Sequence, residues 1–281
     1  MRYQFMRYPG GLAKAFTMSY DDGCAFDLRF ADRISEAGLL GTFNLCTKAH
    51  SAILSDEDIK SHIIDRGHEI AVHGAMHRAS GGLRPIEGIR EVLDCRLELE
   101  KRFGAIIRGM AYPDFGITRF HNGASYEKLK QYLTELDIQY SRTLAGDNNS
   151  YRLPEDWHHW MPTAHHQNPQ LFDWLNEFVL MDVNSLYVTQ RYPRLFYLWG
   201  HSYEFNMNDN WDRLDKICDT ISDKDDIWYA TNMDICAYTK AYESLVYSAD
   251  GEMAYNPTLI DVYLIRDDKQ YCVPSGSTIK F

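Results

Sequence analysis

Two adjacent aspartates and a glycine, Asp21-Asp22-Gly23, follow an apolar segment at residues 15–20 that is typical of a buried strand. Neighbouring carboxylates repel each other unless a cation or a proton lies between them. Glycine tolerates a positive φ, so a turn here could aim one carboxylate at a metal ion and leave the other free as a base. The alternative is a polar turn in which an aspartate caps the following helix.

Two histidines, His73 and His77, stand four residues apart after a short apolar segment at 69–72. This spacing predicts two imidazoles on one face of a helical turn, which suits chelation of a single ion. The chain has 11 histidines, so a chance pair of solvated or hydrogen-bonded rings is the alternative. Together with one aspartate, the pair supplies three ligands and leaves a coordination position open for water, the pattern of catalytic zinc-like sites. Asp21 would then be the neighbouring base.

A further histidine, His201, follows a predicted strand at 195–199. A single histidine after an apolar strand is more often structural than catalytic. At the end of a predicted barrel strand, His201 could instead protonate a leaving amine.

Strand-like and helix-like segments alternate over most of the chain. The predicted strands are 15–20, 41–45, 69–72, 106–111 and 195–199. The predicted helices are 26–37, 56–65 with Ser55 as N-cap, 85–103 and 126–136. Such alternation implies an α/β fold with parallel strands, either an open sheet or a barrel, whose active site lies at the carboxyl ends of the strands. The polar residues that follow the strands are Asp21, Asp22, His73, Tyr112 and His201.

The pattern changes after residue 240. Short strands are predicted at 244–247, 260–265 and 271–273, with turn residues between them. We therefore predict a main domain at 1–240 and a small antiparallel β extension at 241–281 that packs on it and does not fold independently.

Composition restricts the partners. The 281 residues carry a formal charge of −11, which disfavours a nucleic-acid backbone or an anionic membrane surface as partner. No apolar run approaches the ~18 residues of a membrane span. The six cysteines have no C-x-x-C spacing, which favours reduced, buried thiols. Because no signal peptide is visible at the start of the sequence, the prediction is a cytoplasmic protein.

Three segments resemble motifs of the polysaccharide deacetylase (NodB-like, carbohydrate esterase family 4-like) family. Residues 16–23, FTMSYDDG, resemble its T-F-D-D-G motif, and residues 73–77, HGAMH, resemble its H-[ST]-x-x-H motif. Residues 41–43, GTF, resemble the strand between them, and 111–114, AYPD, resemble R-x-P-[YF]. The order and the spacing of these segments match the family pattern, and the resemblance covers roughly residues 14–240. The resemblance implies a distorted, incomplete (β/α) barrel that hydrolyses N-acetyl or O-acetyl groups on polysaccharides.

Carried over by position, the resemblance implies roles for six residues. Asp21 would be the general base, His201 the general acid, and the backbone N–H of Asp114 would help to hold the oxyanion. The metal ligands would be Asp22, His73 and His77.

The sequence also departs from the family pattern. Gly74 stands where Ser or Thr is usual, and Ala111 stands where the family has the arginine that orients the base. Arg108 or Arg142 could supply that charge. The family's Asp-Trp motif, which supports the acid, is not recognisable, and its candidates are Trp157, Trp160 and Asp182.

The predicted activity is metal-dependent removal of an acetyl group from an amide, on an N-acetylated sugar, a polysaccharide or a small conjugate. Zinc is the expected ion, with cobalt, nickel or manganese as alternatives on the same ligands. One rival function is hydrolysis of a cyclic amide or ureide by another metal-dependent enzyme on this fold. The other is a non-catalytic carbohydrate-binding protein. Aromatic residues at 157–166 and 196–205 fit either a sugar-stacking surface or a structural filling of the barrel mouth.

Overall fold

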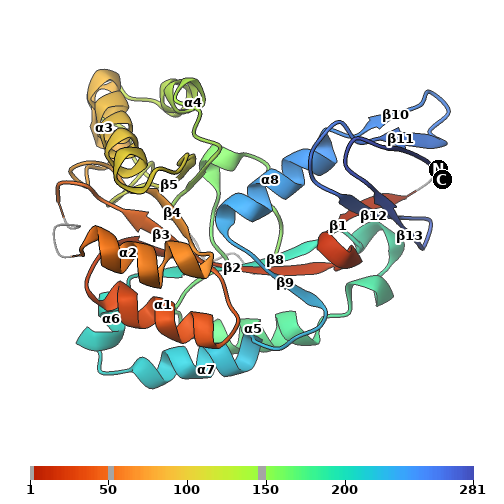
Figure 1. The fold of residues 1–281 in the computed structure, drawn as a ribbon, viewed down its shortest axis with the longest axis horizontal. Helices are drawn as coiled ribbons and strands as arrows, with labels where there is room; N and C mark the ends of the chain where they lie inside the picture. The colour runs from red at the N-terminus through yellow and green to blue at the C-terminus, as the bar shows by residue number, and fades with distance from the viewer. Residues whose placement is uncertain (1–2, 50–53, 145–149) are drawn as a thin grey trace.

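The computed structural model describes residues 3–49, 54–144 and 150–281. Its main feature is a curved sheet of eight strands in which all neighbouring strands are parallel (Figure 1). Seven of them follow the order β6 (Tyr140–Arg142), β5 (Gly109–Ala111), β4 (Glu69–Val72), β3 (Gly41–Leu45), β2 (Lys14–Asp22), β8 (Arg194–Gly200) and β7 (Ala164–His165). The eighth, β9 (Ile227–Tyr229), pairs with the first residues of β2. The incomplete barrel predicted from the sequence is confirmed.

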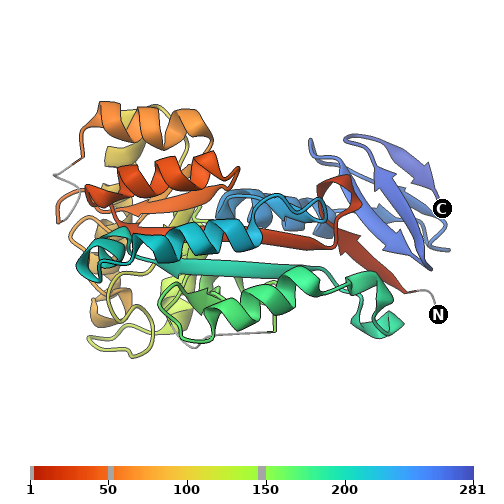
Figure 2. The same cartoon turned by 90° about the horizontal axis from the view of Figure 1, so that it is seen from below.

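Helices cover the outer face of this sheet (Figures 1 and 2). They are α1 (Phe26–Glu36), α2 (Asp56–His62), α3 (Pro85–Phe103), α4 (Tyr126–Glu135), α5 (Leu171–Leu180), α6 (Ser202–Met207) and α7 (Trp211–Ile221). Helix α8 (Asn232–Glu243) packs on the opposite face, where its apolar residues join Ala15 of β2 and Leu195 of β8 in a separate cluster. The local sequence explains several of their ends. Ser55 caps α2 by accepting the backbone N–H of Asp58 at 3.1 Å, as predicted. Pro85 occupies the first turn of α3, and Gly104 ends that helix with a φ of 64°.

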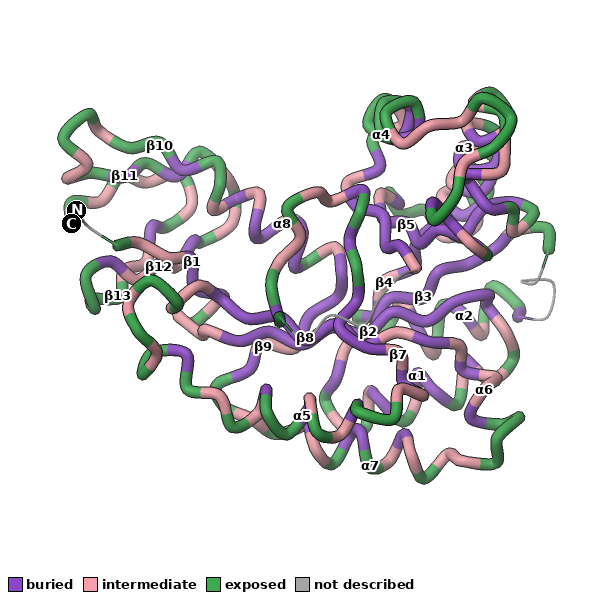
Figure 3. The backbone as a smooth tube through the Cα atoms, turned by 180° about the vertical axis from the view of Figure 1, so that it is seen from behind, coloured by how far each residue is buried: buried purple, intermediate pink, exposed green. Residues whose placement is uncertain are grey.

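The central strand β2 is buried along its whole length, Lys14–Asp22. A strand covered on both faces shows a continuous buried run instead of the alternation of a half-exposed strand. Figure 3 shows the same burial along β3, β4 and β8. On the helix side, Phe30, Ala31 and Ile34 of α1 pack onto this layer. The polar residues at the strand ends are therefore held by a buried, packed apolar layer.

The C-terminal part of the chain, together with the N-terminal strand β1, forms two small antiparallel sheets. One contains β1 (Gln4–Arg7), β12 (Val262–Arg266) and β13 (Lys269–Val273), and the other contains β10 (Val246–Tyr247), β11 (Met253–Tyr255) and β14 (Thr278–Lys280). Because β1 pairs with β12, both chain ends lie at this side of the molecule (Figures 1 and 2). The sequence did not predict β1, and the division at residue 240 falls inside α8.

The predicted strand at 106–111 is shorter in the structure. Only Gly109–Ala111 pairs, while the side chain of Ile106 is 80% exposed. Of the helices in the described part of the chain, none combines the length and the apolar character that crossing a bilayer requires.

Candidate active site

The candidate residues meet at the carboxyl edge of the sheet because the strands are in register there. Asp22 at the end of β2 pairs with Leu45 of β3, which pairs with Val72 of β4. His73 follows directly after β4, and His201 follows directly after β8. Chain positions far apart in sequence are thus brought to one edge.

Asp22 faces both predicted histidine ligands. Its Oδ1 lies 3.5 Å from Nε2 of His73 and 3.2 Å from Nε2 of His77. Two ligands bound to one tetrahedral zinc ion at ~2.1 Å are separated by about 3.4 Å. Asp22 has a φ of 84°, followed by Gly23 at 72°, so the turn after β2 adopts the left-handed backbone that aims this carboxylate away from the strand.

The histidine pair does not lie on a helical turn, and that prediction is wrong. Residues 73–77 form an irregular loop in which Gly74 has a φ of 79° and His77 a φ of 55°. An i, i+4 spacing brings two rings together in a helix, but a loop with two left-handed residues achieves the same convergence. The rings meet edge to face with their centroids 4.9 Å apart.

The ring of His73 is held in one tautomer. Its Nδ1 donates a hydrogen bond to the carbonyl oxygen of Ala111 at 3.0 Å, which leaves a lone pair on Nε2, the nitrogen that faces Asp22. Burial lowers the pKa of His73, although the charges of Asp21 and Asp22 oppose this effect. A neutral ring with a free Nε2 is the form that binds metal.

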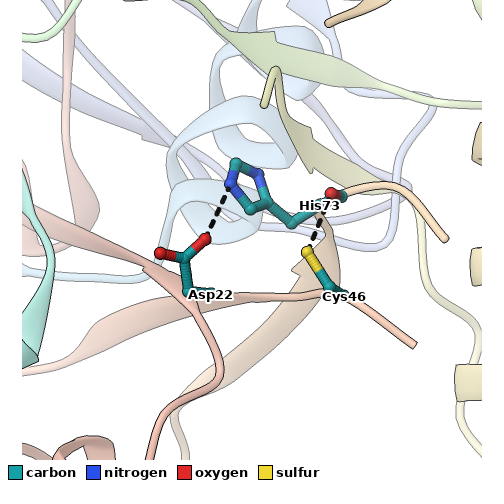
Figure 4. Close-up of side chains that lie close together, drawn as sticks. All are labelled: Asp22, Cys46 and His73. Atoms are coloured by element: carbon teal, nitrogen blue, oxygen red, sulfur yellow. Dashed lines mark hydrogen bonds and ion pairs between the residues drawn. The ribbon is translucent and has the colours of Figure 1, made fainter. Parts of the chain in front are cut away.

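Cys46 is a neighbour that the sequence did not indicate. Asp22, Cys46 and His73 offer possible ligand atoms within 4.8 Å of one another (Figure 4). The thiol of Cys46, however, donates to the carbonyl oxygen of His73 at 3.2 Å, and burial raises the pKa of this thiol strongly. Cys46 therefore supports the main chain of His73.

The donor set fits a divalent ion. Oδ1 of Asp22 is buried and receives no well-directed hydrogen bond from any residue in the described ranges. Burial alone would raise the pKa of Asp22, but the imidazole of His77 and the charges of His73 and His201 outweigh it and bring the pKa to about 2. An anionic oxygen that faces two imidazole nitrogens at these distances is a group that a cation would satisfy.

Asp21 lies beside this group and is 1% exposed. One of its carboxylate oxygens accepts a hydrogen bond from Nδ2 of Asn44 at 2.8 Å, and the other forms a buried ion pair with Arg142. Oδ2 also lies 3.9 Å from Nε2 of His73 and 4.0 Å from Nε2 of His201. Asp21 is thus fixed between the ion-binding group and His201.

Arg142 at the end of β6 supplies the charge that Ala111 cannot. Its side chain is fully buried, and the guanidinium stacks on the ring of Trp199 at 4.4 Å. Arg108, the other candidate, pairs with Asp137 at 2.8 Å near the surface.

His201 has a carboxylate partner, Glu204, in the first turn of α6. Nδ1 of His201 lies 3.3 Å from Oε1 of Glu204, while Oε2 lies 3.2 Å from Nε2 of His165 and 2.9 Å from Nε2 of His166. Burial would raise the pKa of Glu204, but the three imidazoles hold it well below its usual range. Burial lowers and Glu204 raises the pKa of His201, with a net increase.

The other candidates for the supporting motif lie elsewhere. Trp160 is buried in the core against Tyr140 and Tyr197. Asp182 caps the turn at Val183–Ser185 by accepting the N–H of Asn184 at 3.0 Å. Trp157 packs against Trp160. Glu204 was not among the predicted candidates, and its only sequence signal is its spacing of three residues from His201.

The predicted oxyanion residue Asp114 sits just after β5, and its side chain is exposed. Its φ of 51° turns the chain sharply after Pro113. The hydrogen bond from His77 to Asp22 raises the pKa of His77 most, burial opposes it, and the charges of Asp22, Asp21 and Asp114 add to the increase.

A further buried carboxylate, Asp27, connects the turn after β2 with the start of α6. It accepts hydrogen bonds from Ser202 in the first turn of α6 and from Cys24 at 3.8 Å. Burial raises the pKa of Asp27 from 3.8 to about 7, even though these hydrogen bonds lower it.

The raised pKa of Asp27 predicts that Asp27→Asn increases thermal stability, and that the increase depends on pH. The folded protein keeps this carboxyl protonated up to about pH 7, whereas the unfolded chain releases the proton near pH 4. The free energy of unfolding of the parent protein therefore falls as the pH rises between those values. Without metal at pH 8, Asp27→Asn should raise the melting temperature by roughly 3–8 °C. Thermal unfolding at pH 4.5 should show little gain, and an equal gain at both pH values would contradict the assignment.

Comparison with known proteins supports the architecture. Residues 4–140 match the family model for polysaccharide deacetylase, whereas a comparison with curated proteins gives no match. A solved Mycobacterium smegmatis protein classed as a polysaccharide deacetylase has 17% identity and a TM-score of 0.57, over 84% of this chain and 93% of its own. A Pseudomonas aeruginosa PAO1 protein of the same class has 15% identity and a TM-score of 0.57, over 82% and 92%. Puue allantoinase has 13% identity and a TM-score of 0.57, over 82% and 91%.

At these identities the solved structures show a common fold. The family match covers Asp21, Asp22, His73 and His77, whereas Glu204 lies beyond it. The motifs, the half-barrel and the family match agree, and the matched region at residues 4–140 belongs to the polysaccharide deacetylase family.

Proposed function

We propose that this protein is a metal-dependent hydrolase that removes an acetyl group from the amide of an N-acetylated sugar or a related conjugate. The observation that carries the proposal is the position of Asp22 Oδ1, which lies 3.5 and 3.2 Å from the Nε2 atoms of His73 and His77, next to a separately held Asp21. One carboxylate is thereby available for an ion and the other for a proton.

Asp22, His73 and His77 would hold the ion. A divalent ion bound there would lower the pKa of its water to about 7 and polarise the acetyl carbonyl. Two imidazoles and a carboxylate suit zinc, and cobalt, nickel and manganese accept the same ligands. The tautomer of His73, fixed by the carbonyl of Ala111, presents the correct nitrogen.

Asp21 would accept a proton from the attacking water. Arg142 and Asn44 hold its two oxygens, so the carboxylate cannot turn away from the site. In this proposal Arg142 takes the place of the family arginine that is missing at Ala111.

His201 would protonate the departing nitrogen. Glu204 lies beside Nδ1 and favours the cationic ring, while Nε2 lies 4.0 Å from Asp21. The backbone N–H of Asp114 would donate to the carbonyl oxygen as it becomes negative. The acid and the base therefore approach the scissile amide from neighbouring strands.

Acetate release from a panel of acetylated amino sugars, their oligomers and small N-acetyl amides tests this function. Each substrate is incubated with zinc-loaded protein and with protein treated with a chelator. We expect acetate from at least one N-acetyl compound, and chelation should abolish it.

A cyclic ureide belongs in the same panel because Puue allantoinase shares the fold. Ring opening of the ureide without acetate release from any other compound would replace deacetylation by C–N hydrolysis of a cyclic amide. Acetate release that persists in the chelator would contradict the proposed chemistry.

A further inference from the structure

Glu91, on the inner face of α3, makes three hydrogen bonds to the loop that carries His77. Its Oε1 accepts the backbone N–H of Met76 at 2.6 Å and that of Arg78 at 3.2 Å. Its own carbonyl oxygen accepts the N–H of Ala75 at 2.9 Å. One carboxylate oxygen thus holds the backbone N–H groups of the two residues that flank His77.

The backbone of His77 needs such support. Its φ of 55° lies in the left-handed region, which an L-residue adopts at a cost. Two N–H groups directed at one anionic oxygen stabilise a turn of this kind. Glu91 is 6% exposed, so water competes little for these hydrogen bonds.

Gly74 is explained by the same contact. A Cβ built on Gly74 would lie 3.0 Å from Oε1 of Glu91 and 3.4 Å from Cγ of Pro113, and the φ of 79° disfavours any side chain. A side chain at this position would press on the carboxylate, which would have to shift by a few tenths of an ångström.

We infer that Glu91 is a positioning residue for the metal centre, which holds His77 in its ligating orientation from α3. This inference rests on the proposed metal site. Glu91 contacts neither the ion nor the substrate, so its effect should appear first in metal affinity. Loss of an outer partner of a metal ligand weakens metal binding by about 10–100-fold.

The test measures the dissociation constant of Zn²⁺ by competition with a chromophoric chelator on metal-free protein. Glu91→Ala should weaken binding by about 10–100-fold. Glu91→Gln keeps an oxygen that accepts both N–H groups, so its constant should stay within about threefold of the parent value. Glu98→Ala, at an exposed position of the same helix, is the matched control and should bind Zn²⁺ like the parent. Circular dichroism of each metal-free variant verifies folding.

Glu91→Asp provides a second route, because it keeps a carboxylate at this position but draws it back by one CH₂ group from the two N–H groups, and it should also weaken Zn²⁺ binding. This variant decides the question if Glu91→Ala does not fold. Parent-like affinity in Glu91→Ala, or a loss in Glu91→Gln as large as in Glu91→Ala, would overturn the positioning role. Failure of the parent protein to bind Zn²⁺ would instead remove the proposed metal site itself.

Discussion

Asp21→Asn is expected to slow acetate release by about 10²–10⁴-fold while leaving Zn²⁺ binding within a few-fold of the parent value. Asparagine keeps the size of the side chain and can still accept from Asn44 or Arg142, but it cannot take a proton from water. Arg142 then lacks its ion-pair partner in a fully buried position, so some loss of stability should accompany the loss of activity.

Steady-state kinetics on the best N-acetyl substrate, with zinc content determined on the same samples, measures this effect. Asp182→Asn, at the exposed cap of a distant turn, serves as the control and should retain full activity. An Asp21→Asn protein that keeps its zinc and its turnover would show that the base lies elsewhere.

Asp22→Asn should have the opposite pattern, with metal binding and activity lost together. The carboxylate is the only anionic member of the proposed ligand set, and a neutral amide is a poor ligand for zinc. We expect the Zn²⁺ dissociation constant to rise by more than the ~10–100-fold that loss of an outer partner costs.

Chelator competition measures that constant, and acetate release is followed over a range of zinc concentrations. Asp32→Asn is a suitable control, because Asp32 pairs with His62 at 2.7 Å on the surface of α1. Zinc affinity that is unchanged in Asp22→Asn would exclude Asp22 as a ligand.

The sequence predicted the sheet well where strands are long and apolar. β3 and β4 have the predicted bounds, and β2 and β8 differ by at most two residues at either end. The short strand β6 was not predicted, because three residues carry no periodic signal. The segment at Gln4–Arg7 becomes a strand only through pairing with β12, some 260 residues later, and no local pattern indicates such a partner.

The same limit applies to the candidate site. The aspartates and histidines are visible as short motifs, since each lies in one segment. The ion pair of Asp21 with Arg142 joins positions 121 residues apart, so the sequence could offer Arg142 only as one of two alternatives. Glu91 bonds to the His77 loop through main-chain N–H groups. Every residue except proline has such a group, so the residue types in the loop could not indicate this contact.

A zinc titration of metal-free protein, with bound zinc and the rate of acetate release recorded on the same samples, tests the metal-dependent mechanism most directly. The proposed site predicts that the rate rises in proportion to bound zinc and reaches its plateau near one equivalent per chain, as expected for a single mononuclear centre. Full turnover before any zinc is added, unchanged throughout the titration, would contradict it.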